Sequence, residues 1–153
     1  MDHAQQIERF WQSTGMRIDA SVPLAWSFGD SPALADELLE LTLRGEKTAM
    51  ASALWEFEID GDPLPQPGEL AIVLDGAGAP RALIRTTEVE IVPFEDVSPE
   101  HAALEGEGDR SLDYWRAEHE RAWGGSLAHT PYDFDTKMPV VCERFELLFP
   151  LSC

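Results

Sequence analysis

Two apolar segments joined by only five residues constrain the fold more than any other feature of the sequence. Glu69 to Asp75 and Arg81 to Val92 both have the composition of strands, and they are separated by the turn Gly76-Ala77-Gly78-Ala79 and Pro80. A parallel pair needs a crossover of about a dozen residues, so this short connection favours antiparallel pairing. Pro139 to Phe149 is the last strand-like segment. Strands at short spacing, with no helix between them, predict a small, mostly antiparallel barrel of about five or six strands.

A helix-to-strand corner precedes this region. The Ser-Pro pair at residues 31–32 combines a preferred N-cap with a preferred first helical residue, and the helix should run to about Arg44, where Gly45 ends it. Thr48 to Phe57 follows as a strand. Lys47 lies at the junction, where a rigid corner can direct one cation into a cleft. From spacing alone, an exposed lysine that stabilises the negative end of the helix is the simpler interpretation.

The other segments have the expected mixture of helices and loops. Helices are predicted where apolar residues recur at helical spacing or where a Ser-Pro or Ser cap precedes the segment: Ala4 to Thr14, Pro99 to Leu104, and Leu112 to about Trp123, with Gly124-Gly125 as its end. Irregular chain is predicted where proline, glycine and polar residues gather: Ser21 to Asp30, Ile59 to Gly68, Glu105 to Asp109, and 126–137. The sequence therefore predicts an α+β fold in which helices flank the barrel.

Charge restricts the possible partners. The 153 residues, enough for one domain with a single core, carry a formal net charge of −18. Long nucleic acid is bound mainly by lysine and arginine on phosphates, so this surface should repel an extended duplex. The charge favours a small ligand or a short single-stranded RNA, and RNA binding would need a local basic pocket. Residues that could form one are Arg44, Lys47, Arg81, Arg85, Arg110 and Arg144.

Compartment and cofactors can also be predicted. The N-terminal residues have no basic and apolar signal-peptide pattern, and no apolar run is long enough to span a membrane. Cys142 and Cys153 are the only cysteines, which does not suggest a disulfide scaffold, and we expect a cytoplasmic protein. The four histidines have no ligand-like spacing and no phosphate-binding glycine loop is present, so we expect neither a metal nor another cofactor.

Several blocks of the sequence resemble one family. They occur in order over roughly residues 22 to 149 and are Trp26 to Asp30, Ala35 to Leu39, Gly45 to Ala49, Thr87 to Phe94, Glu105 to Arg116, and Pro139 to Phe145. This pattern resembles the ASCH (ASC-1 homology) domains, and the resemblance implies a PUA-like barrel. We expect residues 1–20 to form an N-terminal docking helix of the same domain, and residues 21–153 to form the ASCH domain itself.

The resemblance also implies an active site. In ASCH relatives with known activity the lysine equivalent to Lys47 is catalytic, and a downstream glutamate in an acidic stretch matches Glu107 or, less closely, Glu105. Lys47 would stabilise developing negative charge and Glu107 would transfer the proton. The branch that hydrolyses N4-acetylcytidine also has a threonine three residues after the lysine. Here that residue is Met50, which has no hydroxyl, and Ser52 lies about 7 Å farther along the strand.

Three classes of function remain open. The first is binding of RNA or a nucleobase-containing ligand in a barrel cleft, with ribonuclease-type hydrolysis of short RNA. The second is an amidohydrolase for an N4-acylated cytidine, and the third is a non-catalytic module that binds a ligand or a protein. His119 is expected to be a buried, hydrogen-bonded core residue. The predicted substrate-binding residues are Trp26, Phe28, Thr48, Arg85, Glu105 and Arg110.

Overall fold

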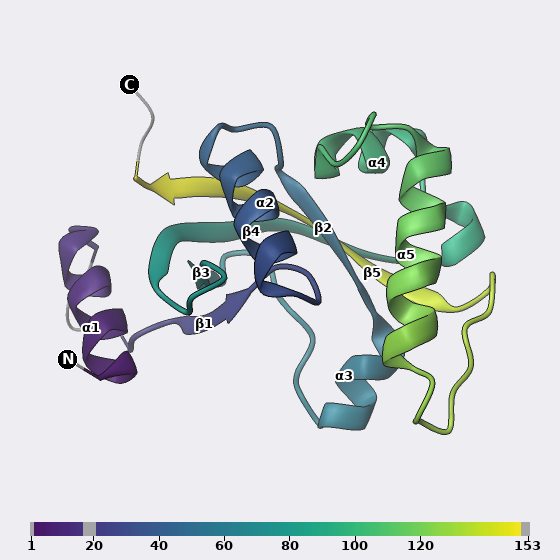
Figure 1. Ribbon diagram of the computed structural model, residues 1–153, viewed down its shortest axis with the longest axis horizontal. Helices are drawn as coiled ribbons and strands as arrows, with labels where there is room; N and C mark the ends of the chain where they lie inside the picture. The colour runs from purple at the N-terminus through teal and green to yellow at the C-terminus, as the bar shows by residue number, and fades with distance from the viewer. Residues whose placement is uncertain (1, 17–20, 151–153) are drawn as a thin grey trace.

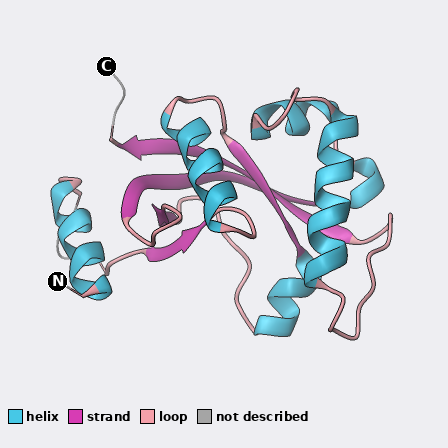
Figure 2. Cartoon of the chain, in the orientation of Figure 1, coloured by secondary structure: helices cyan, strands magenta, loops and turns pink. Residues whose placement is uncertain are grey.

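A computed structural model describes residues 2–16 and 21–150 of the chain (Figure 1). Within these residues, helices lie around one five-stranded sheet, in the order β1-β3-β4-β5-β2 (Figure 2). The sheet curls into a half-barrel, and the predicted α+β PUA-like fold is confirmed. The helices are α1 (His3–Ser13), α2 (Pro32–Leu43), α3 (Leu54–Asp60), α4 (Pro99–Glu105) and α5 (Leu112–Ser126), with a short 3₁₀ turn at Phe94–Asp96. The strands are β1 (Leu24–Ser27), β2 (Ala49–Ala53), β3 (Leu70–Leu74), β4 (Pro80–Pro93) and β5 (Pro139–Phe149).

The two long strands form the centre of the sheet. β4 pairs antiparallel with both β3 and β5, and β5 pairs antiparallel with β2. Only the edge pair β1–β3 is parallel among the described strands. Register shifts between Leu83 and Ile84, and between Thr86 and Glu88, interrupt the β4–β5 ladder. Such irregularities bend a strand and increase its twist, which suits the curled sheet.

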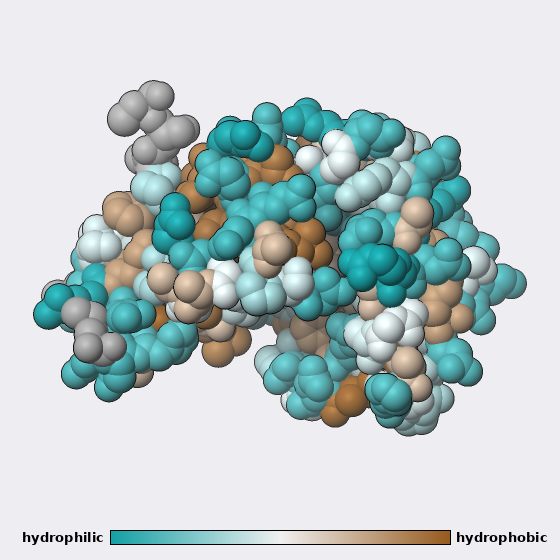
Figure 3. All heavy atoms as spheres, viewed as in Figure 1, coloured by the Kyte–Doolittle hydropathy of each residue, from teal (hydrophilic) through white to brown (hydrophobic). Residues whose placement is uncertain are grey.

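Helix α2 covers the concave face of the sheet in front of β4 (Figure 1). The Ser31 hydroxyl accepts a hydrogen bond from the backbone N–H of Leu34, so the predicted cap is present. Leu38 and Leu39 are buried in a cluster that includes Phe28 and Phe145. The helix ends at Leu43 with Arg44 as its C-cap, one residue before the predicted end at about Arg44. Its outer face is hydrophilic, and apolar residues show in patches beside it on the surface (Figure 3).

The other end of the sheet is covered by α4 and α5. Trp115 and Trp123 of α5 pack with Phe94 in a second core cluster, at ring-centroid distances of 5.3 and 6.1 Å from that phenylalanine. At the opposite side of the molecule, Trp11 of α1 is buried against strand residues that include Ile72. The expected boundary between an N-terminal helix and the rest of the domain, at residues 20 and 21, borders residues 17–20, which lie outside the described part.

Three predicted boundaries are wrong. The segment Ser21 to Asp30 is not wholly irregular, because β1 forms there by pairing with β3, which is distant in sequence. The strand expected from Thr48 to Phe57 stops at Ala53 and continues as helix α3. Ala53 pairs with Val140 near the first residue of β5, so residues beyond Ala53 run out of partner strand. Helix α5 also continues through Gly124-Gly125 to Ser126.

The structure bears on the expectations about disulfides and membrane-spanning segments within the residues that it describes. Cys142 is buried and forms no disulfide within the described residues, and Cys153 lies outside them. None of the helices in 2–16 and 21–150 is both long enough and apolar enough to cross a membrane.

Candidate functional site

Backbone hydrogen bonds to two neighbouring helices fix the corner between α2 and β2. The backbone N–H groups of Glu46 and Lys47 both donate to the carbonyl of Leu41, at 2.9 and 3.1 Å. The next residue, Thr48, donates its N–H to the Leu104 carbonyl at 2.8 Å. These bonds direct the Lys47 side chain inward, where only 2% of it is exposed. The simpler interpretation from spacing, an exposed lysine at the helix end, is therefore wrong.

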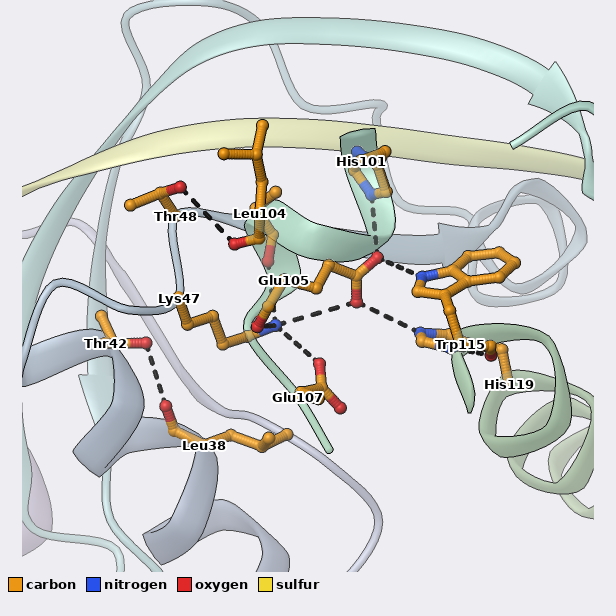
Figure 4. Close-up of polar contacts among 11 residues, drawn as sticks. Leu38, Thr42, Lys47, Thr48, His101, Leu104, Glu105, Glu107, Trp115 and His119 are labelled. Atoms are coloured by element: carbon orange, nitrogen blue, oxygen red, sulfur yellow. Dashed lines mark hydrogen bonds and ion pairs between the residues drawn. The ribbon is translucent and has the colours of Figure 1, made fainter. Parts of the chain in front are cut away.

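The Lys47 ammonium group has acceptors for all three of its protons (Figure 4). Nζ lies 2.9 Å from the Ala49 carbonyl oxygen, 2.8 Å from Glu107 Oε2 and 3.4 Å from the Glu105 carbonyl oxygen. The Glu105 carboxylate is 3.8 Å away, and the Phe28 ring centroid is at 5.3 Å. The predicted pair Lys47 and Glu107 is thus joined by a direct ion pair, although the two residues are sixty positions apart.

The Glu105 carboxylate is the buried centre of a second set of contacts. The Trp115 indole N–H donates to Oε2, and His101 Nε2 lies 2.8 Å from the same oxygen. His119 Nε2 is 3.3 Å from Oε1, and its Nδ1 is 2.8 Å from the Trp115 carbonyl oxygen. Both ring nitrogens of His119 therefore face acceptors, and only the protonated imidazolium can donate to both. Burial lowers the pKa of His119, but the hydrogen bond and charge of Glu105 outweigh it and raise the pKa.

The two glutamates of this site have opposite pKa shifts. Burial raises the pKa of Glu105, but the charge of Lys47 and the hydrogen bonds from the two histidines reverse this and hold the pKa well below its usual value. Burial also raises the pKa of Glu107, and there the opposing effect of Lys47 is too small, so the pKa remains raised. Two carboxylates with divergent pKa values suit different roles. Glu105 stays ionised as an anchor, whereas Glu107 is the group suited to exchanging a proton.

A cavity of about 400 Å³ opens beside this pair. It lies among the segment after β1, the helices α2 and α5, and strand β2. Its charged or titratable lining residues are mostly acidic: Asp30, Glu56, Glu105, Glu107 and Glu118 against Lys47, Arg121 and His119. A second chamber of about 760 Å³ adjoins it, and both are lined by Ser27, Phe28, Gly29, Met50, Ala51 and Ser52. We call the two together the cleft, with a Lys47 chamber and a far chamber.

Comparison with known families decides the classification. The sequence profile of the ASCH domain matches residues 24–148. The chain belongs to the ASCH domain family. ASCH domains have a PUA-like fold, which is often linked to RNA binding. A comparison with curated proteins finds no match.

Three solved structures resemble this ASCH domain. A protein of the DUF984 family from Enterococcus faecalis V583 is 38% identical, with a TM-score of 0.87, over 95% of this chain and 91% of that one. An ASCH domain from Lactobacillus crispatus JV V101 is 27% identical, with a TM-score of 0.86, over 94% of both chains. A hypothetical protein at 16% identity, with a TM-score of 0.52, covers 81% of this chain and 99% of its own and shares the fold alone.

The predicted substrate-binding residues of this ASCH domain fall into two groups. Phe28 lines both chambers, Trp26 lines the far chamber, and Glu105 lines the Lys47 chamber. The rings of Trp26 and Phe28 meet edge to face at 5.1 Å. Both aromatic residues also pack against the core cluster below α2, so they serve the core and the cleft wall together.

The other three predicted substrate-binding residues, Thr48, Arg85 and Arg110, do not line the cleft. The Thr48 hydroxyl is 3.5 Å from the Leu104 carbonyl oxygen, on the opposite side of the corner. Arg85 is exposed and pairs with Glu146 across the β4–β5 ladder. Arg110 is exposed, and its guanidinium lies 3.7 Å from a Glu46 carboxylate oxygen. Neither arginine contributes to a basic pocket around Lys47, because each is exposed and lies beside a surface glutamate.

Sequence reasoning missed the residues that hold Glu105. His101 is four residues before Glu105, and Trp115 and His119 are four residues apart on α5, so each pair shares a helix face. That spacing was the available signal, but it could not show that both faces converge on one carboxylate. His119 was expected in the core, and its side chain is indeed mostly buried and hydrogen-bonded, yet it also lines the Lys47 chamber. Within residues 2–16 and 21–150, no three His, Cys, Asp or Glu side chains are grouped to hold a metal ion.

Proposed function

We propose that this ASCH domain binds a neutral, nucleobase-containing ligand in its cleft and hydrolyses an amide bond of that ligand, with Lys47 and Glu107 as the catalytic pair. The observation that carries the proposal is the 2.8 Å contact between Lys47 Nζ and Glu107 Oε2 at the wall of the Lys47 chamber. This contact joins a group that stabilises an oxyanion to a group whose pKa burial has raised.

The charge of the cleft favours a neutral ligand over a phosphodiester. Five carboxylates line the Lys47 chamber, and its arginine, Arg121, is already paired with Glu118 and with Asp30. Lys47 is the remaining strong cation there, and it is closely paired with Glu107. A phosphate would approach this surface against repulsion from several carboxylates. A nucleoside amide has no formal charge and avoids that repulsion.

The geometry suggests how the amide would be attacked. The longest of the three Lys47 contacts is the 3.4 Å one to the Glu105 carbonyl, so a substrate carbonyl oxygen can replace it with the smallest loss. Lys47 then stabilises the negative charge that forms on that oxygen. The Glu107 carboxylate takes a proton from the attacking water and delivers it to the departing nitrogen. One water and one amide give a carboxylic acid and an amine.

Because position 50 is a methionine, the proposed mechanism has no side-chain hydroxyl beside Lys47 and uses a water molecule alone as the nucleophile. It lines both chambers on the strand that follows Lys47, but it brings no hydroxyl to the reaction. The hydroxyl of Ser52 also lines the cleft, about 7 Å farther along the strand. If a hydroxyl at position 50 assists the reaction, Met50→Thr should hydrolyse N4-acetylcytidine faster than the parent, as measured by release of cytidine.

The decisive experiment compares two substrates and four proteins. Purified parent, Lys47→Met, Glu107→Gln and Lys137→Met are each incubated with N4-acetylcytidine and with a short single-stranded RNA, and products are separated by mass. Loss of the general acid–base group should slow hydrolysis about 10²- to 10⁴-fold. Lys137 is exposed and outside the cleft, so its variant controls for loss of a lysine. Full activity in Lys47→Met, or no turnover of either substrate by the parent, would refute the proposal.

Ribonuclease-type cleavage of short RNA is the second candidate. The Lys47–Glu107 pair is also suited to RNA cleavage, since Lys47 could stabilise the phosphate and Glu107 could accept the 2′-hydroxyl proton. This reaction needs no hydroxyl at position 50. Cleavage of the RNA without hydrolysis of N4-acetylcytidine would select this candidate. Thermal stabilisation by nucleosides without any product would select a non-catalytic binding module instead.

A further inference from the structure

Glu143 is a buried carboxylate that neither the ion pair nor the histidine cluster uses. It lies on β5 directly opposite Met50 of β2, and it lines the far chamber. Only 3% of the residue is exposed. The Thr86 hydroxyl is 3.3 Å from Oε1. Within the described residues, the carboxylate has no ion-pair partner, and Oε2 has no hydrogen bond.

The stability of the fold does not explain why a carboxylate is buried at position 143. A buried carboxylate with one neutral partner loses hydration that the single contact does not replace. Glu105, buried to a similar degree, is instead contacted by Lys47 and by a tryptophan and two histidines. An apolar side chain at position 143 would suit the sheet better. The carboxylate therefore presents a free acceptor at the wall of the far chamber, which suits a ligand that donates a hydrogen bond to it.

The far chamber has the shape and lining of a small-molecule site. Its volume of about 760 Å³ is within the usual range for such sites. Its walls are largely aromatic, aliphatic or proline side chains: Trp26, Phe28, Phe57, Pro63, Pro65 and Leu70. The charged side chains in its described lining are all acidic: Asp62, Glu69 and Glu143. A phosphate is unsuited to this chamber, whereas an uncharged group with hydroxyl donors is suited to it.

We propose that Glu143 accepts a hydrogen bond from a sugar hydroxyl, so that the cleft selects an unphosphorylated nucleoside over a free base or a nucleotide. This inference rests on the proposed function, because it takes the reacting amide to be at Lys47. The base then lies along the wall that both chambers share, at Phe28 and Met50. The sugar is attached at the opposite edge of the base from the acylated amine, and it reaches the far chamber beside Glu143.

The test measures equilibrium binding, which does not depend on turnover. Affinities for cytidine, cytosine and cytidine 5′-monophosphate are determined by calorimetry for the parent, Glu143→Gln, Glu143→Leu and Glu40→Gln. The parent should bind cytidine about tenfold more tightly than cytosine, as one hydrogen bond allows, and the monophosphate least tightly. Glu143→Leu should lose the preference for cytidine, and Glu143→Gln, which keeps shape and one acceptor, should reduce it. Glu40→Gln, which removes an exposed carboxylate outside the cleft, should retain it.

The outcomes separate the two proposals. An unchanged cytidine-to-cytosine ratio in both folded Glu143 variants overturns the role of Glu143, whatever the catalytic assays show. Equal binding of cytidine and cytosine by the parent overturns it as well. A preference that depends on Glu143, in a protein that hydrolyses no amide, supports nucleoside selection and refutes only the catalytic proposal. If Glu143→Leu does not fold, the isosteric Glu143→Gln alone decides the result.

Discussion

Replacement of Glu143 by glutamine should change how the stability of the protein depends on pH. Burial raises the pKa of Glu143 from about 4.5 to about 7, against the opposing hydrogen bond from Thr86. The native state therefore holds this proton more tightly than the unfolded chain does. The resulting stabilisation is fully present below pH 4.5 and is lost as pH rises towards 7. Glutamine is neutral throughout, so Glu143→Gln should not show this loss.

The size of the effect follows from the two pKa values. A shift of about 2.5 units corresponds to about 3 kcal/mol of unfolding free energy, of which about 1 kcal/mol is already lost at pH 5 and nearly all by pH 8. Relative to the parent, the free energy of unfolding of Glu143→Gln should therefore increase by about 2.5 kcal/mol between pH 5 and pH 8. The variant keeps an acceptor for the Thr86 hydroxyl, so no opposing change is expected from that contact.

Urea unfolding at pH 5, 6, 7 and 8 measures this difference directly. Glu40→Gln, an exposed replacement on α2, controls for the loss of one negative charge from an acidic protein. A constant difference between Glu143→Gln and the parent across this range would refute the argument. It would mean that Glu143 is hydrated, or paired in a way that keeps its proton affinity ordinary, and it would remove the reason to expect a ligand at Oε2.

Two further substitutions test the packing of the site. Gly106 has a φ of +71°, and an added Cβ would lie 2.4 Å from the Glu46 carbonyl oxygen, so Gly106→Ala should lower the free energy of unfolding by about 2 kcal/mol or more in urea titrations. Gly124→Ala, at a helical glycine with open space around it, is the control and should raise that energy by about 0.5–1 kcal/mol. Trp115→Phe removes the indole donor to Glu105 and should destabilise the protein by about 1–3 kcal/mol; an unchanged urea midpoint would show that this bond contributes nothing.

Local signals were sufficient for most elements of the fold. The Ser-Pro pair at residues 31–32 and Gly45 mark the two ends of α2, since capping depends on residues within one turn. Pro139–Phe149 and Pro80–Pro93 are long enough for composition to identify them as strands. β1 was missed because four residues after a proline have little local signal, and only pairing with β3 makes them a strand. The change from β2 to α3 likewise depends on where the partner strand begins.

The candidate site was predictable in part. The resemblance to ASCH domains named Lys47 and both glutamates, but it left open which carboxylate would face the lysine. That choice depends on where α4 ends: Glu105 is its last residue and is directed into the packing between α4 and α5, while Glu107 is beyond the turn at Gly106. The role proposed for Glu143 had no signal in the sequence, because Arg144 and Glu146 are on the same strand and charged residues are normally exposed.

In the proposed mechanism, the different surroundings of the two glutamates allow Lys47 to be buried and still to face the cleft in an ion pair. The Glu105 carboxylate is contacted by His119, whose two nitrogens both face acceptors, and it lies 3.8 Å from Lys47, so its charge is shared between these two groups. Lys47 and Glu107 then form a second, nearly neutral pair at the cleft. Under the proposed function, a neutral substrate would enter without burying an unbalanced charge, and charge stabilisation and proton transfer would both take place within this pair. Gly106 is essential to this arrangement, because only a residue without a Cβ can pass so close to the corner that places Lys47.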